Sequence, residues 1–402
     1  MIKIAVLGYG VVGSGVVHVL DKNSDRICQN AGQRIDVKYI LEIREFPDCP
    51  YGSLFMNDFE TIVNDPEIAV VVEVIGGVDA ALAYTRRCLE AGKNVVTSNK
   101  ELVAEHGSEL LRLAMEKGVN YLFEASVGGG IPVIRPLAQC MTANTINEIY
   151  GILNGTTNYI LTDMERNGAN FSDALHEAQK KGYAESDPTA DIEGHDTCRK
   201  ICILSSLAFG RHIYPYLIPT EGITGVTVND MRYAAKLGYK VKLLGRSRIT
   251  GDKVSVYVAP HLVNRHSILA EVDDVMNGVV IRGNAVGNVT FCGAGAGKLP
   301  TASAVVADVI DAVKHLHARR WISWTEGCED LIVDPAMLAS AWYVRTDAPR
   351  DKVEKEFGSV LFAEETGIET VFVTSVMNGK MVRELLDRGI NALSQFRILG
   401  DY

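Results

Sequence analysis

The chain has 402 residues, of which 47% are hydrophobic, and carries a formal net charge of −10. This length predicts two or three domains, and the negative charge disfavours nucleic acid and anionic membrane surfaces as partners. No apolar run reaches the length of a membrane-spanning helix, and the first residues lack the pattern of a signal peptide. The eight cysteines are scattered, which is typical of a reducing compartment. We therefore expect a cytoplasmic protein.

The first elements predict a dinucleotide site. An apolar strand at 3–7 leads into G-Y-G-V-V-G and then into a helix, which is the context that a G-x-G-x-x-G motif requires. Gly8 permits the tight turn, Gly10 lets the pyrophosphate approach, and Gly13 lets helix and strand pack closely. The amides at the start of the helix, where Val11 and Val12 lie, suit phosphate groups.

The end of the second strand, at 37–41, bears on the choice of nicotinamide cofactor. Glu42 would bind the ribose 2′-hydroxyl of NAD, whereas Arg44 would favour the 2′-phosphate of NADP. We give slight preference to NADP, with NAD as the alternative. Arg44 could equally be a solvated surface charge.

Further strands at 69–75, 94–97 and 120–123 alternate with helices at about 79–91 and 101–117. This alternation predicts a parallel, doubly wound sheet, and ligands bind at the carboxyl ends of such strands. The side chains or backbone expected at those ends are Gly76, Lys100 and Glu124.

Three consecutive glycines follow Glu124, at positions 128–130. A carboxylate beside exposed carbonyl groups suits a hard cation, but glycine runs are first of all permissive loops. From the residues alone, a hinge that leaves the first domain is the preferred interpretation.

The middle of the chain predicts an α+β domain with a mixed sheet, whose outer face is a candidate subunit interface. The expected strands are 146–153, 240–247, 254–259, 277–282 and 286–292, and the expected helices are 157–167, 171–180, 188–209 and 228–238.

The segment 182–200 concentrates charged groups, including Glu185, Asp191 and Asp196, ahead of an apolar helical run. Asp196 and Lys200 are four residues apart, so they share a helix face and can meet. We expect them at the mouth of a cleft, and the alternative is an ordinary surface ion pair.

Cys198 and Cys202, near His195, fit buried thiols better than a metal site, because their spacing is not C-x-x-C.

A second glycine loop, at 293–298, is not a phosphate loop, because Cys292 and Leu299 stand where glycine and a hydroxyl residue are needed. We expect a loop that closes over the cofactor, with Thr301 capping the next helix; a plain strand-to-helix turn is the alternative.

The tail, 338–402, has the predicted order βαββαβ, which is the order of a ferredoxin-like unit. Its expected role is ligand sensing or subunit pairing.

Over about residues 1–320 the chain resembles the homoserine dehydrogenase family. The resemblance rests on seven motifs in order: G-Y-G-V-V-G at 8–13, V-E-V-I-G-G at 72–77, S-N-K at 98–100, E-A-S-V-G-G-G-I-P at 124–132, N-G-T-T-N-Y-I at 154–160, the acidic stretch ending in lysine at 182–200, and G-A-G-A-G-K-L-P-T-A-S-A at 293–304.

The resemblance implies the reversible NAD(P)H-dependent reduction of L-aspartate 4-semialdehyde to L-homoserine, toward threonine, methionine and isoleucine. It implies a dinucleotide domain at 1–130 completed by a helix at about 300–320, a catalytic and dimerisation domain at 131–299, an ACT-like domain at 338–402, and a homodimer or homotetramer. It makes Lys200 the proton donor, with Lys100 between nicotinamide and substrate.

The same resemblance assigns the remaining site residues. Glu185, Asp191 and Asp196 would bind the substrate, and Asp196 would also orient Lys200. Ser98, Gly76 and Gly297 would contact the cofactor. The Glu124 carboxylate and the carbonyl groups of Val127, Gly129 and Ile131 would bind a sodium ion, which favours the cation interpretation over the hinge.

The tail departs from the family pattern. Many members carry a Pro-Gly-Val-Leu turn in an ACT domain, whereas this chain has Asp347-Ala348-Pro349-Arg350-Asp351, which puts threonine inhibition in doubt.

Two rival functions stay open at this point. Aspartate-semialdehyde dehydrogenase would need an activated cysteine nucleophile, and a non-catalytic nucleotide sensor would not need Glu185, Asp196 and Lys200 to converge.

Overall fold

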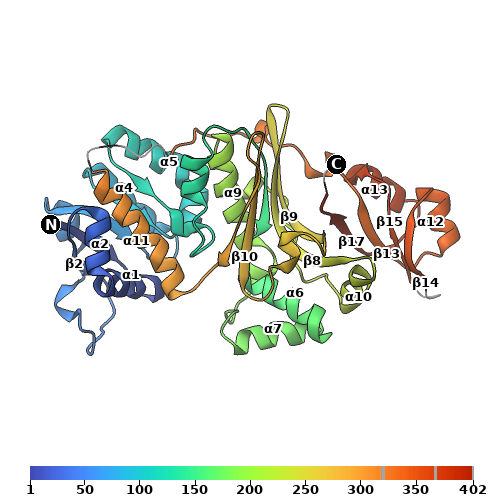
Figure 1. Ribbon diagram of the computed structural model, residues 1–402, viewed down its shortest axis with the longest axis horizontal. Coiled ribbons are helices and arrows are strands. Elements are labelled where there is room, and N and C mark those ends of the chain that lie inside the picture. Colours follow the sequence, from blue (N-terminus) through green and yellow to red (C-terminus); the bar gives the residue numbers. More distant parts are fainter. Residues whose placement is uncertain (317, 319–321, 366–368, 401–402) are drawn as a thin grey trace.

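The computed structural model describes residues 1–402 apart from 317, 319–321, 366–368 and 401–402. The molecule is elongated, and its two main sheets follow one another along the long axis (Figure 1). Within the described ranges, none of the helices combines the length and the apolar character needed to cross a bilayer.

The first sheet has six parallel strands in the order β3-β2-β1-β4-β5-β6, which confirms the predicted doubly wound α/β architecture. Its strands are β1 (Ile2–Leu7), β2 (Ile35–Leu41), β3 (Phe55–Met56), β4 (Ile68–Glu73), β5 (Asn94–Thr97) and β6 (Tyr121–Leu122). The strand order reverses between β1 and β4. In sheets of this kind the ligand crevice opens at that reversal, beyond the carboxyl ends of the strands.

Helices cover both faces of this sheet, because successive strand residues point to opposite sides and both sides are apolar. Ile4 and Val6 of β1 pack toward one face, whereas Ala5 and Leu7 pack toward the other. The helices of the first face are α1 (Val11–Lys22), α2 (Ser24–Ala31) and α11 (Lys298–Lys314), and those of the second are α3 (Phe59–Asn64), α4 (Asp79–Glu90) and α5 (Lys100–Lys117).

The helix α11 comes from a distant part of the sequence and returns to lie beside α1 (Figure 1). The contact is close at Gly15, where an added Cβ would lie 2.8 Å from the carbonyl oxygen of Lys298. Only glycine fits at this position without displacing backbone. The second glycine loop, which leads into α11, is therefore held close to the first glycine turn, which leads into α1.

The second sheet is mixed, as predicted, and its first five strands are antiparallel neighbours in the order β11-β10-β7-β8-β9. They are β7 (Ile146–Ile152), β8 (Tyr239–Thr250), β9 (Lys253–Asn264), β10 (Met276–Gly283) and β11 (Gly287–Ala294). The accompanying helices are α6 (Gly155–Asn167), α7 (Phe171–Lys180), α8 (Thr189–Ile192), α9 (His195–Phe209) and α10 (Val228–Lys236). Of these, α9 packs against β7, β8 and β9 on one side and against α5 on another, so it lies between the two sheets.

The single helix predicted at 188–209 is wrong, because the chain breaks it between α8 and α9. Gly194 takes a left-handed conformation, with φ of +83°, which ends the first helical turn and redirects the chain. The break lets α9 begin at His195. Asp196 and Lys200 therefore lie at the N-terminal end of a new helix rather than in the middle of a long one.

The tail contains β13 (Trp342–Thr346), α12 (Arg350–Phe357), β14 (Leu361–Glu365), β15 (Thr370–Val373), the two-residue β16 (Met377–Asn378), α13 (Gly379–Leu386) and β17 (Ala392–Ile398). Four of its strands extend the second sheet in the order β17-β13-β15-β14 and are antiparallel to one another. The strand β17 joins β9 in parallel through two residue pairs, Arg397 with His261 and Ile398 with Leu262. A short strand, β12 (Ala339–Ser340), pairs with β16.

A buried polar network also links the tail to the middle of the chain. Asp230, on α10, is fully buried and accepts hydrogen bonds from Arg345 Nε at 2.8 Å, Tyr343 Oη at 2.9 Å and Ser394 Oγ at 2.9 Å. The Arg345 guanidinium also donates to Glu369. Because the charged groups are paired and hydrogen-bonded, this network can stay dry between the two parts.

Candidate active site

Two lysines and one aspartate meet where α5 faces α9. Lys200 Nζ lies 2.6 Å from Asp196 Oδ2, and Lys100 Nζ forms an ion pair with Asp196 Oδ1. Lys100 is the first residue of α5, which begins at the carboxyl end of β5, whereas Asp196 and Lys200 belong to the first turns of α9. The three side chains therefore join the crevice of the first sheet to the helix α9, which packs against the second sheet. We call Lys100, Asp196 and Lys200 the lysine–aspartate cluster.

Burial and charge set the protonation of this cluster. Burial alone would raise the pKa of Asp196, but the ammonium groups of Lys200 and Lys100 hold that pKa well below its ordinary value. Burial lowers the pKa of Lys200, Asp196 opposes this, and Lys100 adds to the lowering. The result is an ionised aspartate beside a lysine that gives up its proton more readily than an exposed lysine does.

Lys200 keeps one N–H group free of the interactions described. Its ammonium donates to the carbonyl oxygen of Leu153 at 2.8 Å and to Asp196 at 2.6 Å. A lysine ammonium has three N–H groups, so the third can donate to a ligand. Lys200 is 8% exposed, which places this remaining donor in a largely water-free environment.

Asn154 is a member of the site that the sequence analysis did not identify as a functional residue. Its amide group donates to Asp191 Oδ1 at 2.6 Å and to Asp196 Oδ2 at 2.8 Å, and its oxygen accepts from the backbone N–H of Thr157 at 2.8 Å. It thereby caps α6 and joins Asp191 to the lysine–aspartate cluster. The position of asparagine just before a helix, in the motif at 154–160, was the available signal.

Asp191 lies at the edge of the cluster, half-buried, and burial raises its pKa despite the hydrogen bond from Asn154. Glu185 is placed differently. It lies exposed on the loop before α8, and its side chain makes no hydrogen bond or ion pair with the cluster in the described structure. The structure thus brings together four of the five residues proposed for catalysis and substrate binding.

The glycine turn at 8–13 has the close approaches that the motif requires. Gly8 has a φ of +99°, and its N–H donates to the carbonyl oxygen of Leu41 at 2.9 Å. A Cβ at Gly13 would lie 2.0 Å from the carbonyl oxygen of Gly8, so no other residue fits there. At Gly10 the nearest atom to an added Cβ is Arg44 Nη2, 3.9 Å away, which leaves the space before Val11 and Val12, at the start of α1, open to a ligand.

Glu42 and Arg44 pair with one another beside this turn. Arg44 Nη2 lies 2.8 Å from Glu42 Oε2, and Tyr9 donates its backbone N–H to the same oxygen at 2.9 Å. The hydrogen bond from Arg44, with those from the backbone of Tyr9, Arg44 and Ile43, lowers the pKa of Glu42 to about 2 against the opposing effect of burial. Both an acid and a guanidinium thus stand at the end of β2.

The turn after β4 is held by a buried carboxylate. Glu73 accepts from Thr97 Oγ1 at 2.5 Å and from the backbone N–H of Ile75 at 2.7 Å, and burial raises its pKa to about 7. Asn99 caps α5 and also donates to the carbonyl oxygen of Gly77 at 2.6 Å. These bonds fix the strand ends that carry Gly76 and Ser98, which face the same crevice as Lys100.

The two later glycine segments contact one another. A Cβ at Gly129 would lie 2.5 Å from the carbonyl oxygen of Gly295, and the N–H of Gly130 donates to the carbonyl oxygen of Ala294 at 3.0 Å. Gly297, with φ of +121°, is the N-cap of α11. The predicted cap by Thr301 is wrong, because α11 begins three residues earlier and Thr301 lies within its first turn.

Glu124 is buried at the end of the first sheet, in the short helix η2 (Glu124–Ser126). Its carboxylate accepts three backbone N–H groups, those of Val133 at 2.7 Å, Ile134 at 2.8 Å and Arg135 at 2.8 Å. Val127, Gly129 and Ile131 are buried residues, and their carbonyl groups accept no hydrogen bond from the described residues. Buried carbonyl oxygens without partners are ready ligands for a hard cation.

The cysteines near the cluster face elsewhere. Cys198 and Cys202 are buried, and Cys198 Sγ lies 3.7 Å from the carbonyl oxygen of Pro215, away from Lys200. In the part of the chain that is described, no group of three or more His, Cys, Asp or Glu side chains is arranged to hold a metal ion. The interpretation of these two residues as buried thiols fits this placement.

A parallel dinucleotide-binding sheet, a glycine turn at its first helix and a buried lysine at its crevice define the class as an NAD(P)-dependent oxidoreductase. The family model for the homoserine dehydrogenase NAD-binding domain matches residues 8–124, and the model for homoserine dehydrogenase matches residues 132–310. The chain belongs to the homoserine dehydrogenase family, as the resemblance predicted.

Individual proteins agree with this assignment. The chain is 45% identical over 314 residues to homoserine dehydrogenase of Pseudomonas aeruginosa, covering 78% of this chain and 72% of that protein. A homoserine dehydrogenase structure from Thiobacillus denitrificans has a TM-score of 0.90 and 36% identity, with 99% and 98% of the two chains covered. A hyperthermophilic archaeal homoserine dehydrogenase in complex with NADPH has a TM-score of 0.65 and 27% identity, with 77% and 97% covered.

Proposed function

We propose that the chain catalyses the reversible NAD(P)H-dependent reduction of L-aspartate 4-semialdehyde to L-homoserine. The observation that carries this proposal is the free N–H group of Lys200, held inside the lysine–aspartate cluster at the crevice of the first sheet. Family membership supports the same reaction. A nucleotide sensor would not need two lysines and an aspartate to converge on that crevice.

The mechanism follows from what the cluster can do. When bound, a dihydronicotinamide would supply hydride to the aldehyde carbon, and negative charge would then develop on the carbonyl oxygen. The free N–H group of Lys200 stabilises this charge and transfers its proton to the oxygen, which yields the alcohol. Lys200, left neutral, regains a proton from solvent. In the oxidative direction the neutral amine accepts the proton from the hydroxyl group.

Asp196 and Lys100 support this proton transfer. The Asp196 carboxylate orients the Lys200 ammonium, and Lys100 balances the negative charge on the other side of the carboxylate. Lys100 also lies at the strand ends of the cofactor sheet, so it would stand between nicotinamide and substrate. Asp191 and Asp196 would bind the polar end of the substrate. Glu185 would reach the substrate amino group only after its exposed loop moves inward.

The cofactor would lie over the glycine turn and the strand ends, in contact with Gly8, Gly10, Val11, Val12, Gly13, Arg44, Gly76, Ser98, Lys100 and Gly297. The exposed guanidinium of Arg44 supports NADP, because it can turn from Glu42 toward a 2′-phosphate. The ionised Glu42 supports NAD as the alternative. The two glycine segments in contact, at 129 and 295, support a loop that closes over the cofactor.

A sodium ion fits the segment that joins the two sheets. The carbonyl oxygens of Val127, Gly129 and Ile131 would hold it, together with the remaining lone pair of Glu124 Oε2. Such an ion would rigidify the loop between the cofactor sheet and the second region.

We propose three domains: a dinucleotide domain at 1–130, completed by α11, a catalytic and dimerisation domain at 131–299, and an ACT-like, ferredoxin-like tail at 338–402. The two sheets and the βαββαβ order of the tail support this division. We place the enzyme in the cytoplasm, as a homodimer or homotetramer that acts toward threonine, methionine and isoleucine.

The test compares wild type with Lys200→Ala in NADPH oxidation with L-aspartate 4-semialdehyde. We expect kcat to fall by about 10²–10⁴, the usual contribution of a positioned proton donor, with cofactor affinity by NADPH fluorescence unchanged. Lys180→Ala is the matched control, because Lys180 is 73% exposed on α7 and pairs with Glu177. Unchanged turnover in Lys200→Ala would remove this lysine from the mechanism.

A further inference from the structure

The carboxamide of Asn277 is buried without a hydrogen-bond partner. Asn277 lies on β10 and is fully buried, and neither its Nδ2 nor its Oδ1 has a partner among the described residues. No other residue in the described ranges has two buried side-chain polar atoms without a partner. Such atoms are rare in folded proteins, because the lost contact with water is not compensated. The pair therefore points to a hydrogen bond that forms in another arrangement of the chain around Asn277.

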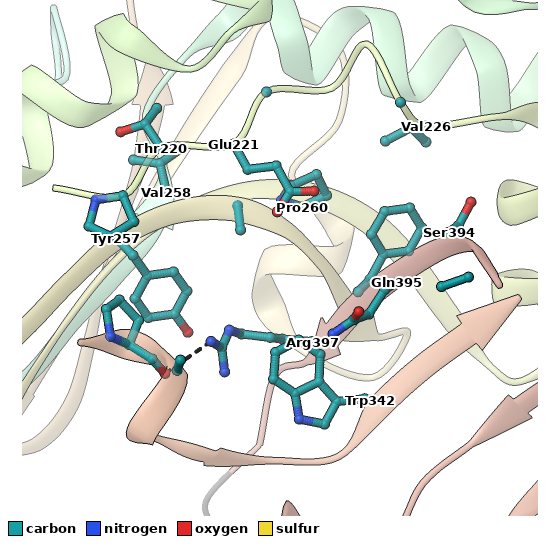
Figure 2. A pocket seen from close by; sticks show the side chains of 18 of the residues that line it. Thr220, Glu221, Val226, Tyr257, Val258, Pro260, Trp342, Ser394, Gln395 and Arg397 are labelled. Atoms are coloured by element: carbon teal, nitrogen blue, oxygen red, sulfur yellow. Dashed lines mark hydrogen bonds between the residues drawn. The ribbon is translucent and has the colours of Figure 1, made fainter. Parts of the chain in front are cut away.

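Arg397 shows how an unpaired buried group can be compensated. Its Nη1 also lacks a hydrogen-bond partner in the described structure, at a cavity between β9 and the tail (Figure 2). However, its guanidinium lies 4.2 Å from the ring centroid of Trp342 and 5.0 Å from that of Tyr257, and Nη2 donates to the carbonyl oxygen of Pro335 at 3.0 Å. Ring faces attract a cation, whereas Asn277 carries no charge that could be stabilised in this way.

Gly295, in the second glycine loop, lies directly against the carboxamide of Asn277. A Cβ added at Gly295 would lie 2.1 Å from Cγ and Nδ2 of Asn277 and 2.4 Å from its Oδ1, and these are the three nearest atoms. Gly295 is itself buried, and its N–H and carbonyl groups form no backbone hydrogen bond within the part of the chain that is described. Unpaired donors and acceptors of the side chain and of the loop are thus in contact.

The loop 293–298 also contacts both parts of the proposed cofactor site. A Cβ at Gly129, in the segment after the first sheet, would lie 2.5 Å from the carbonyl oxygen of Gly295. At the end of the loop, the carbonyl oxygen of Lys298 lies 2.8 Å from a Cβ added at Gly15, on α1. A change in the backbone at Gly295 would therefore be felt at the glycine turn that precedes α1. Glycine permits such a change at low steric cost.

We propose that Asn277 is a positioning residue for the cofactor, because its carboxamide forms hydrogen bonds with the backbone of Gly295 when the loop 293–298 closes over the bound cofactor. This inference rests on the proposed function, which places the cofactor under that loop. The hydrogen bonds gained on closure add to the affinity for the cofactor. Asn277 thus contributes to cofactor binding from the second sheet without touching the cofactor itself.

Asn277→Ala separates a role in cofactor binding from a role in the fold. We expect the Kd for NADPH, measured by fluorescence titration, to rise about tenfold, because the hydrogen bonds of the closed loop are lost. The melting temperature without cofactor should not fall, since the substitution removes two unpaired polar atoms. Asn288→Ala is the matched control and should change neither quantity, because Asn288 is exposed on β11 of the same hairpin and accepts from Arg282.

The opposite result, a lower melting temperature with an unchanged Kd, would show that Asn277 serves the fold alone and would overturn the proposal while leaving the proposed function intact. A wild-type protein that binds neither NADPH nor NADH would reject the proposed function and this inference together. If Asn277→Ala does not fold, Asn277→Thr decides by the same two measurements, because a β-branched side chain suits a strand and also lacks the carboxamide.

Gly295→Ala tests the contact from the side of the loop. The added methyl group meets the carboxamide of Asn277, so we expect weaker NADPH binding by about tenfold. In the double variant with Asn277→Ala this clash is gone, and NADPH should bind no more weakly than it does to Asn277→Ala alone. Effects that simply add in this double-mutant cycle would show that the two residues act independently, and the proposal would then fail.

Discussion

Lys100 and Lys200 contact the two different oxygens of one carboxylate, that of Asp196, although they come from helices on opposite sides of the crevice. The carboxylate is therefore both a connection between the two regions and the group that keeps two nearby ammonium ions from repelling each other. Changes at this carboxylate should affect chemistry, because it contacts both ammonium groups of the cluster.

Replacing Asp196 by Asn should impair the reduction and shift its pH dependence. Asp196 raises the pKa of Lys200 against the effects of burial and of Lys100, so its loss lowers that pKa further. The protonated form then disappears at lower pH, and the alkaline limb of the kcat profile for aldehyde reduction should move to lower pH, with kcat down at least about tenfold. The shift should be smaller in Asp191→Asn, because Asp191 raises the pKa of Lys200 less than Asp196 does and makes no direct ion pair with it. An unmoved alkaline limb would contradict the assignment.

Asn154→Ala should disrupt the site and weaken a helix at once. The amide that joins Asp191 to Asp196 is lost, and so is the cap of α6. We expect kcat to fall while stability drops by about 1 kcal/mol, the usual cost of a lost N-cap. Asn170→Ala is the matched control, since Asn170 caps α7 through Asp173 and lies on the surface. Equal effects of the two variants on kcat would remove Asn154 from the site.

Gly10→Ala should block the cofactor without harming the fold. In the protein the nearest atom to the added Cβ is 3.9 Å away, so the methyl group fits and projects into the space proposed for the pyrophosphate. We expect the Kd for NADPH to rise at least about tenfold with an unchanged melting temperature. Gly52→Ala, where nothing lies within 4 Å, provides the control. Tight NADPH binding by Gly10→Ala would mean that the cofactor does not cross this turn.

Glu73 should make stability depend on pH near neutrality. Burial raises its pKa to about 7, above the ~4.3 of an unfolded glutamate. The folded state then binds more protons than the unfolded state between these values, so the contribution of Glu73 is present in full below about pH 4 and is lost as the pH rises through 7. Glu73→Gln mimics the protonated form and should flatten the melting temperature between about pH 5 and 8, where the wild type declines. Parallel curves for the two proteins would contradict this.

The buried polar network around Asp230 should contribute to the stability of the protein. Arg345→Met leaves Asp230 fully buried without its charged partner, which should cost about 3–5 kcal/mol in urea unfolding. Arg350→Met removes an exposed pair with Glu354 and should cost less than about 1 kcal/mol. Similar losses in the two variants would show that the network contributes little.

The first sheet could be predicted well because its signals are local. The strand at 3–7, the turn at 8–13 and the alternation that follows all depend on neighbours in sequence, and the structure has them in the predicted order. The pairing of Asp196 with Lys200 was likewise predictable from their spacing of four residues. These features needed no knowledge of distant contacts.

The features that were missed depend on contacts between distant segments. Gly194 breaks the helix predicted at 188–209 because the chain there packs against Thr220 and Val258, which pattern alone does not reveal. Asn154 joins the cluster only because α6 starts beside α9.

The strand β17, the last one in the described residues, lies between β9 and β13 in the second sheet. During synthesis, the upstream strands can assemble as they leave the ribosome, but the seam between the two halves of the nine-stranded sheet stays open until β17 has emerged. A chain interrupted before β17 would therefore leave the edges of β9 and β13 unpaired, and such exposed strand edges promote aggregation.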